Sequence, residues 1–432
     1  MDPLIIGFAA IALVIILIGA GVPIAVSLGI VGIAGTMLLK GVDVGLQIGT
    51  IVSFTSIASY MLTIIPFFLL MGSFAMYSGI TSDAYNIGNK WMGFLPGGLA
   101  SATMVGCALF AATSGSSVAT SGAIGKIAIG EMKRYGYNER LACGCVAAGG
   151  LLGIMIPPSI ILVLYGIITE ESIGKLLIAG FFPGILTALI FIIGITLKAI
   201  KNPELAPRAK SYSLKERLVS LKGGIGVIVL ILSVLGTLYA GILTPTEAGA
   251  VGAFVALILF ALRNWRKESF IDSLKDASRV TCTMFTIIIG ASIFAKFLVL
   301  TRVPLYTARF MVDLEISPLL LFVLIALVYI PLGMFLDPVS ILAITLPLFY
   351  PVMTTVGFNG IWFGIVVVKL IELGLITPPV GFNVYIIKSI APDVPLEDVF
   401  RGVAFFFFLE IIVLSLLVMF PVIALWLPAK IF

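Results

Sequence analysis

The strongest constraint on this chain is an apolar, helix-length segment that glycine and proline interrupt half-way. Residues 152–158 read LGIMIPP, and a related stretch, LGLITPP, recurs at residues 373–379. Proline removes an amide donor and clashes with the preceding turn, so both helices are expected to break at their proline pairs. In lipid such a break is tolerated only where the freed backbone groups face protein, water or a ligand.

The composition places these broken helices in a membrane. Of the 432 residues, 60% are hydrophobic and 11% are charged, whereas soluble domains carry about 25% charged residues. Apolar runs of about 20 residues, which is enough to cross a hydrocarbon core of about 30 Å, recur along the whole chain. We therefore expect an all-α integral membrane protein, embedded in the lipid bilayer, with residues 4–20 as its first span. The absence of His excludes Ser-His catalysis and His-containing zinc sites, and we expect neither an enzyme nor a nucleic-acid-binding protein.

Two helical hairpins are expected beside the broken helices. In the first, at residues 97–134, the turn SGSS (residues 114–117) joins two apolar arms of about 15 residues, each reaching only about 22 Å at 1.5 Å per residue. Such arms favour a re-entrant hairpin that turns near the middle of the membrane; two tilted full spans with an external loop are the alternative. The second hairpin, at residues 316–356, turns at residues 333–338 (GMFLDP).

Both halves of the chain show the same order of elements. At a constant offset, Gly136 and Asn138 align with Gly357 and Asn359, and the two proline pairs align with each other. We expect two repeats, separated by a polar linker. The first repeat covers residues 1–200 and contains the hairpin 97–134 and the broken helix 141–168; the linker covers residues 201–217; the second repeat covers residues 218–432 and contains the hairpin 316–356, the broken helix 362–387 and a last helix at residues 403–427.

Lys and Arg determine the expected orientation. If the linker 201–217 is cytoplasmic, that face collects most of the 26 Lys and Arg residues, as the positive-inside rule requires. Lys369 is counted among the few on the external face. The repeats are then inverted, with both termini outside, and the hairpins enter the membrane from opposite sides.

Inverted repeats of this kind bring hairpin turns and helix breaks together near the middle of the membrane. Free helix ends there offer carbonyls to cations and amides to anions. The turns and breaks of this chain are small and rich in oxygen, which suits a hard cation such as sodium, and they lack the several carboxylates of a calcium site. For any single Ser or Gly, close helix packing is the alternative explanation.

A few charged residues fall inside the expected spans. Asp337 is expected to be the only carboxylate deep in the membrane, where it could balance a cation or cap the helix that begins at Pro338. No pair of intramembrane carboxylates is expected, which argues against a sodium/proton antiporter. Arg302 could bind a substrate carboxylate or extend to lipid headgroups, and Lys296 is a weaker case of the same kind. Glu247 is expected to cap a helix start.

Together, the SGSS turn, the paired LGIMIPP and LGLITPP segments and the GMFLDP turn resemble the large membrane subunit of tripartite ATP-independent periplasmic (TRAP) transporters. The resemblance covers nearly the whole chain. It implies an inverted-repeat, elevator-type transporter, in which a mobile domain with two re-entrant hairpins and two broken transmembrane helices slides against a scaffold. It also implies sodium-coupled import of an organic acid, such as a C4-dicarboxylate or sialic acid, across the inner membrane, with sodium ions for coupling and no other cofactor.

Partners and site residues follow from the same resemblance. The family works with a small four-helix membrane subunit and a periplasmic solute-binding protein that delivers the acid, and we expect both as separate chains. A stand-alone sodium/anion symporter of the divalent-anion type would share the fold and is the alternative. Family sodium sites carry over to Ser114, Gly115, Ser117, Gly149, Gly153, Pro157, Gly333, Asp337, Thr377 and Gly381. Contacts to the substrate are expected from Ser116, Ser159, Arg302, Ser340 and Asn383.

Overall fold

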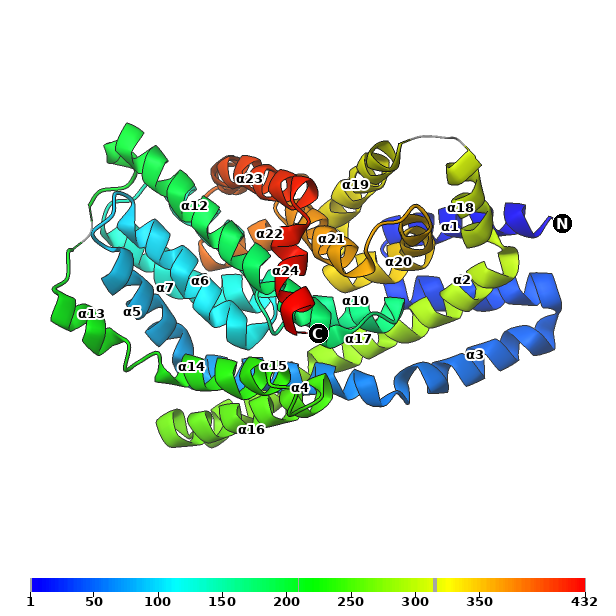
Figure 1. The fold of residues 1–432 in the computed structure, drawn as a ribbon, viewed down its shortest axis with the longest axis horizontal. Helices are drawn as coiled ribbons and strands as arrows, with labels where there is room; N and C mark the ends of the chain where they lie inside the picture. Colours follow the sequence, from blue (N-terminus) through cyan, green and yellow to red (C-terminus); the bar gives the residue numbers. More distant parts are fainter. Residues whose placement is uncertain (1, 209, 314–316, 432) are drawn as a thin grey trace.

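The computed structural model describes residues 2–208, 210–313 and 317–431, and this part of the chain is helical, with no β-strand. Figure 1 shows an elongated bundle. By length and composition, seven of the described helices can cross a membrane, or up to nine if each bent pair counts as one span. The prediction of an all-α fold is confirmed for the described residues, and the apolar helices are consistent with a multi-pass membrane protein.

Helices from the two halves pair reciprocally: α2 packs along α17, and α4 packs along α16. Glycines allow the close approach, because a Cβ on Gly290 of α17 would lie 2.3 Å from the carbonyl oxygen of Ala25 on α2. The 35-residue α17 is continuous. The bounds are α1 Pro3–Gly19, α2 Ile24–Lys40, α3 Val42–Ile57, η1 Tyr60–Thr63, α4 Ile64–Tyr77, α16 Pro245–Asn264 and α17 Lys267–Thr301.

Both expected hairpins are present, with longer arms than expected. The first consists of α6 (Gly98–Ser114) and α7 (Ser117–Arg134), with 17 and 18 residues, and the second of α19 (Pro318–Phe335) and α20 (Pro338–Thr355), with 18 each. At 1.5 Å per residue an 18-residue arm reaches about 27 Å, so length alone does not decide between a re-entrant hairpin and two full spans. Residue 316, the expected start of the second hairpin, lies outside the described residues.

Both helices break at their proline pairs. In the first half, the segments Glu139–Met155 and Ile160–Thr169 meet at an angle of 43°. The expected last helix is itself interrupted after Met419, where Phe420 leaves the helical conformation and Pro421 provides no N–H. The bounds are α8 Glu139–Gly149, α9 Leu152–Met155, α10 Ile160–Thr169, α21 Gly360–Leu375, α22 Phe382–Ile390, α23 Leu396–Met419 and α24 Val422–Ile431.

Aligned residues of the two halves have the same local geometry. Gly136 and Gly357 have positive φ angles of 75° and 91°, and Asn138 and Asn359 cap α8 and α21 by accepting two backbone N–H bonds each. The second segments of the broken helices are exchanged between the halves, because α10 packs on α20 and α22 packs on α7. These correspondences support the expected duplication.

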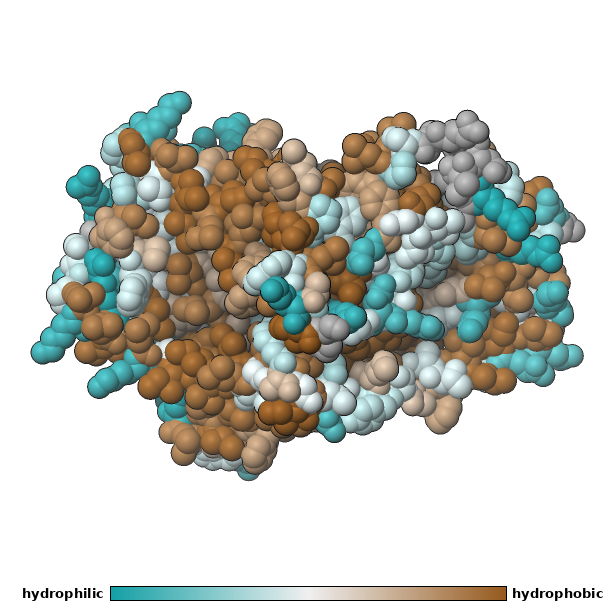
Figure 2. Space-filling view, viewed as in Figure 1, coloured by the Kyte–Doolittle hydropathy of each residue, from teal (hydrophilic) through white to brown (hydrophobic). Residues whose placement is uncertain are grey.

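The remaining helices connect these units and cover them. A broad apolar surface extends over α12, α14 and α16, and charged side chains gather at the two ends of the molecule (Figure 2). Within the expected linker 201–217, a capping box at Ser213 and Glu216 starts a helix that continues to Ser220. The bounds are α5 Ile80–Met92, α11 Ile173–Ala179, α12 Phe181–Lys201, η2 Pro203–Leu205, α13 Leu214–Ser220, α14 Ile225–Ile231, η3 Leu232–Gly236, α15 Thr237–Tyr239 and α18 Val303–Asp313.

Candidate functional site

The first hairpin turn lies directly on the first helix break, and we call this region the first cluster. Gly115 has φ +60°, and a Cβ there would lie 2.6 Å from the carbonyl oxygen of Pro158. A Cβ on Gly153 would lie 2.4 Å from the carbonyl oxygen of Ser116. The Ile160 N–H donates to the carbonyl of Gly115 at 3.4 Å. The turn therefore fits against the break because two glycines leave room for it.

Hydroxyl groups surround this contact. Ser114 Oγ and Thr120 Oγ1 are hydrogen-bonded at 2.9 Å. Ser116 caps α7 by accepting the Ala119 N–H, and Ser159 caps α10 in the same way. Ser114, Ser159 and Thr120 are buried, and Ser116 is half-buried. Thr120 was not predicted, although its position one turn into α7 could have been read from the sequence.

A residue of the second half completes the first cluster. Asn383, at the start of α22, is buried and accepts a hydrogen bond from Ser117 Oγ at 3.2 Å. Its Nδ2 donates to the carbonyl of Ala147 on α8 at 3.2 Å. Ser117 and Asn383 were assigned to different ligands from the sequence, and the structure brings them into one hydrogen-bonded group.

The glycines of α8 serve close packing against neighbouring helices. A Cβ on Gly149 would lie 2.8 Å from the sulfur of Cys107 on α6, so this glycine faces the hairpin arm. A Cβ on Gly150, the residue after α8, would lie 1.7 Å from Ser121 Oγ on α7. Pro157 is buried in the break. For Gly149 the contact matches the alternative explanation, close helix packing.

The second hairpin turn meets the second helix break through a pair of glycines, and we call this region the second cluster. A Cβ on Gly374 would lie 2.4 Å from the Cα of Gly333. Asp337 accepts backbone N–H bonds from Val339 at 3.0 Å and Ser340 at 3.2 Å, and the Ser340 hydroxyl donates to its other oxygen. The prediction that Asp337 caps α20 is confirmed, as is the capping role of Glu247, which forms a capping box at the start of α16.

The loop of the second break is more open than that of the first. Thr377 donates to the carbonyl of Leu373, and Gly381 has φ +60°. Pro378 and Pro379 are exposed, whereas both prolines of the first break are buried. Arg302 is exposed at the turn between α17 and α18, and the contacts that build the two clusters do not involve it.

Helix ends converge at both clusters. The C-terminal ends of α6 and α9 meet at the first, and those of α19 and α21 meet at the second. The last carbonyls of a helix lack intrahelical donors and carry a partial negative charge. Each cluster therefore combines hydroxyl or carboxylate oxygens with free carbonyl groups, a donor set that suits a hard monovalent cation.

The structure corrects two expectations about charged residues. Glu372 on α21 and Glu410 on α23 are completely buried, so Asp337 is not the only carboxylate deep inside the protein. Lys369, which was counted on the external face, is also completely buried and pairs with both of them. Glu372 and Glu410 form a buried carboxylate pair, so the argument against a sodium/proton antiporter no longer applies. All three residues stand out in the sequence as charges within apolar runs.

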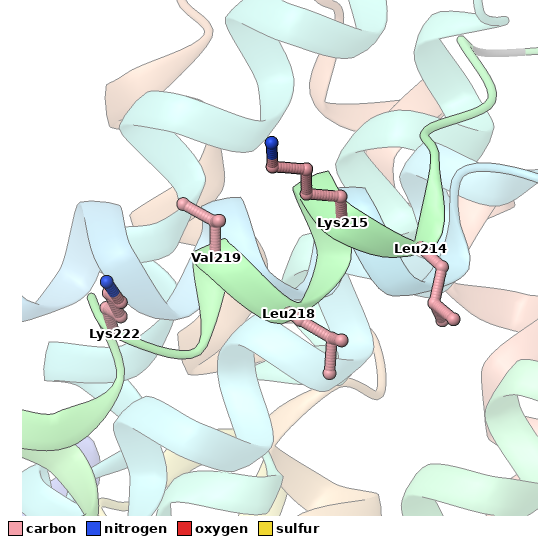
Figure 3. Close-up of a pocket in the computed structure, with 5 residues that line it drawn as sticks. All are labelled: Leu214, Lys215, Leu218, Val219 and Lys222. Carbon is pink, nitrogen blue, oxygen red and sulfur yellow. The ribbon is translucent and has the colours of Figure 1, made fainter.

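A hollow on the surface lies away from these clusters, along the linker helix α13. Leu214, Lys215, Leu218, Val219 and Lys222 line it, as Figure 3 shows. The lysines alternate with exposed apolar side chains along a short helix, which is typical of a segment that lies at a membrane surface. It provides no enclosed site for a small ligand.

The whole chain can now be compared with known proteins. The model of one family, the DctM component of the tripartite ATP-independent periplasmic transporter, matches residues 11–423. This chain belongs to the DctM family. A C4-dicarboxylate TRAP transporter large permease protein of Pseudomonas aeruginosa is 38% identical over 407 residues, covering 93% of each chain. A sialic acid TRAP transporter large permease protein of Vibrio cholerae is 30% identical over 423 residues, covering 95% of this chain and 96% of the relative.

A solved structure has the same overall fold as this DctM-family chain. It is the YdaH transporter of Alcanivorax borkumensis, with a TM-score of 0.62 over 91% of this chain and 90% of that one. The identity is 13%, so the similarity concerns the fold alone. The named relatives are transporter permeases rather than enzymes, in agreement with the predicted class.

Proposed function

We propose that this DctM-family chain is the large permease subunit of a sodium-coupled transporter that imports an organic acid across the bacterial inner membrane by an elevator mechanism. The observation that carries the proposal is the seating of both hairpin turns against helix breaks. Ser114 and Ser117 at the first turn are 4% and 3% exposed. A turn in an external loop would face solvent, so this burial supports a re-entrant hairpin.

Sodium ions are proposed as coupling ions, one at each cluster. At the first, the hydroxyls of Ser114 and Ser117 and the free carbonyls at the end of α6 would bind the ion. At the second, Asp337 and Thr377 and the carbonyls at the end of α19 would do so. The lack of a Cβ allows the backbone groups to approach the ions at Gly115, Gly153, Gly333 and Gly381. We leave Gly149 out of the sodium site because it faces Cys107.

The organic acid is proposed to bind on the open side of the second cluster. The first turn of α22 has no side-chain cap and carries backbone N–H groups that favour a carboxylate. The side chains of Ser340 and Asn383, at the starts of α20 and α22, are already hydrogen-bonded to Asp337 and to Ser117 and Ala147. The chemistry fits the relatives, which are named for C4-dicarboxylate and sialic acid. Ser116 and Ser159 remain candidates at the first cluster. Arg302 is left out because it belongs to neither cluster.

The repeats are proposed to be inverted, with the linker in the cytoplasm and both termini outside. The mixed lysine and leucine surface of α13 would then lie at the cytoplasmic membrane surface. A reporter enzyme fused after residue 210 is expected to be active only on the cytoplasmic side. Activity on the external side would reverse the orientation of the whole chain.

Two partners are proposed as separate chains: a small four-helix membrane subunit and a periplasmic solute-binding protein. The chain covers 93% of a relative named as a large permease protein, which supports a division into subunits. Reconstitution in proteoliposomes tests the proposal. Uptake should require an inward sodium gradient, the small subunit and a binding protein loaded with the acid. Uptake by this chain alone would instead favour a stand-alone sodium/anion symporter.

A further inference from the structure

Three charged side chains meet in the interior, outside both clusters. Lys369 and Glu372 lie on α21, Glu410 lies on α23, and all three are completely buried. Lys369 Nζ forms ion pairs with both carboxylates and donates a hydrogen bond at 3.0 Å to Thr187 on α12. We call these three charged residues the buried triad.

The charges of the triad do not balance if both glutamates are ionised. Lys369 supplies one positive charge against two negative ones. Within the described ranges, the charged groups that interact with Lys369 and Glu372 are the other members of the triad. An uncompensated charge in a protein interior costs several kcal/mol. One further positive charge is therefore required.

Other charged groups on the two helices, and on the helices packed against them, have partners of their own or, as with Lys201 on α12, are exposed. They do not supply the missing charge. The contacts are Lys198 with the ring of Phe405, Lys430 with the ring of Trp426, Lys388 with the carbonyls of Pro392 and Val394, Arg401 with Glu397, Arg140 with Asp398, and Glu139 with Lys133.

The geometry of the two carboxyl groups indicates what the missing charge is. Glu372 and Glu410 lie within hydrogen-bonding reach of each other. Treated as ionised groups, Glu372 Oε1 and Glu410 Oε2 have no hydrogen-bond donor. Ionised carboxylates only accept hydrogen bonds, so a bond between them requires a proton on one. A metal cation in the same place would be repelled by the adjacent Lys369 ammonium.

We propose that Glu372 and Glu410 bind one proton between them, so that the buried triad is a neutral proton site. The proton stays bound during transport, because complete burial separates the site from water. The neutral triad connects α21 to α23 and α12. It thereby fixes the helix whose C-terminal end, at Gly374, supports the second cluster. The proposal does not depend on which ion drives uptake.

Infrared spectroscopy of the purified full chain tests the proposal directly. The wild type should show the carbonyl stretch of a protonated carboxylic acid, shifted in heavy water, and this band should be lost in both Glu372→Gln and Glu410→Gln. The control is Glu397→Gln, an exposed glutamate on the same helix as Glu410, which should leave the band unchanged. Absence of the band in the wild type, or its survival in both variants, would overturn the proposal.

Thermal unfolding provides a second test. Glutamine resembles a protonated glutamate, so each single Glu→Gln variant should unfold close to the wild-type temperature. Lys369→Met should be less stable, and its stability should fall further as the pH rises, because its folded form must hold a second proton that the unfolded chain releases. A Lys369→Met variant whose stability does not change with pH would contradict the assignment.

Two further outcomes would also overturn the proposal. If sodium supplies the missing charge, sodium should raise the unfolding temperature of the wild type by more than that of Glu410→Gln, which keeps both clusters, and the infrared band should be absent. If the proton is exchanged during transport, an imposed pH gradient should change uptake by the wild type but not by Glu410→Gln. The infrared measurement requires no transport. A negative infrared result would therefore contradict the proton site without bearing on sodium coupling.

Discussion

The two clusters share their local structure and differ in burial. In both, a hairpin turn capped at its second arm by Ser116 or Asp337 meets a helix that breaks at a proline pair. All of residues 156–159 in the first break are buried, whereas Thr377 is half-buried and the two prolines after it are exposed. The same motif thus forms a closed site in one half and an open site in the other.

Packing explains the difference. The first break is covered by α11 and α12, and a Cβ on Gly180 would lie 2.5 Å from the carbonyl oxygen of Met155. A Cβ on Gly184 would lie 2.5 Å from the side chain of Ile156. At the second break, the close neighbour of Gly381 outside its own loop and helix is the ring of Phe400, at 3.0 Å by the same measure. The comparison suggests a fixed first cluster and a second cluster that can exchange its ligand.

The largest expected effect comes from adding a methyl group at the glycine contacts. Gly153→Ala and Gly374→Ala should each abolish sodium-dependent uptake, because their Cβ atoms would overlap backbone atoms of the hairpin turns. Overpacking of this kind typically costs about 1–3 kcal/mol of stability. Uptake in proteoliposomes and thermal unfolding measure both effects. Gly122→Ala in α7 is the matched control, because its Cβ would meet nothing within 4 Å. An active Gly374→Ala variant would show that the second contact is loose.

The next expected effect separates the charge of Asp337 from its capping role. Asp337→Asn and Asp337→Ala should both lose uptake, because neither can balance a bound cation. The Ala variant should also lose about 1 kcal/mol of stability with the helix cap, whereas the Asn variant should keep most of it. Ser116→Ala, the aligned cap in the first cluster, removes a cap without removing a charge. If Asp337→Asn takes up substrate at the wild-type rate, the role of Asp337 is limited to capping α20.

The backbone of these clusters could be predicted from the sequence because it depends on local chemistry. Proline pairs break helices wherever they occur, and Asn138, Asn359 and Asp337 cap helices through their own side chains. The hairpin arms are longer than the sequence predicted, because the residue at which a helix ends depends on the segments packed around it. Phe335, for example, was placed in the second turn but continues α19.

The parts that could not be predicted depend on contacts between distant segments. Glu372 and Glu410 are visible as charges in apolar runs, but nothing in the sequence pairs Glu410 with Lys369 across two helices. The hydrogen bond between Ser117 and Asn383 likewise joins residues of different halves. The open second break could not be predicted either, since its exposure depends on which helix covers it.

A smaller effect, severalfold in rate, tests the difference in burial directly. Phe382 and Ile160 are the first residues of α22 and α10 and are 41% and 1% exposed. In a variant without native cysteines, Phe382→Cys should react severalfold faster with a small maleimide than Ile160→Cys. Saturating sodium and loaded binding protein should slow the reaction at position 382 if the second cluster closes over its ligands. Equal reaction rates at the two positions would contradict the difference in burial.

The smallest expected effect concerns the base of the first hairpin, where Lys133 at the end of α7 forms ion pairs with Asp393 and Glu139. The hydrogen bond from Lys133 lowers the pKa of Asp393. A lowered carboxyl pKa adds stability above the pKa of the unfolded chain, and this stability is lost as the pH falls through the folded pKa. Asp393→Asn should therefore remove a small, salt-sensitive contribution to stability near neutral pH and leave uptake unchanged, since the first cluster is held mainly by buried contacts. If Asp393→Asn reduces uptake strongly, then the exposed ion pair, and not the packing around Gly153, fixes the first cluster.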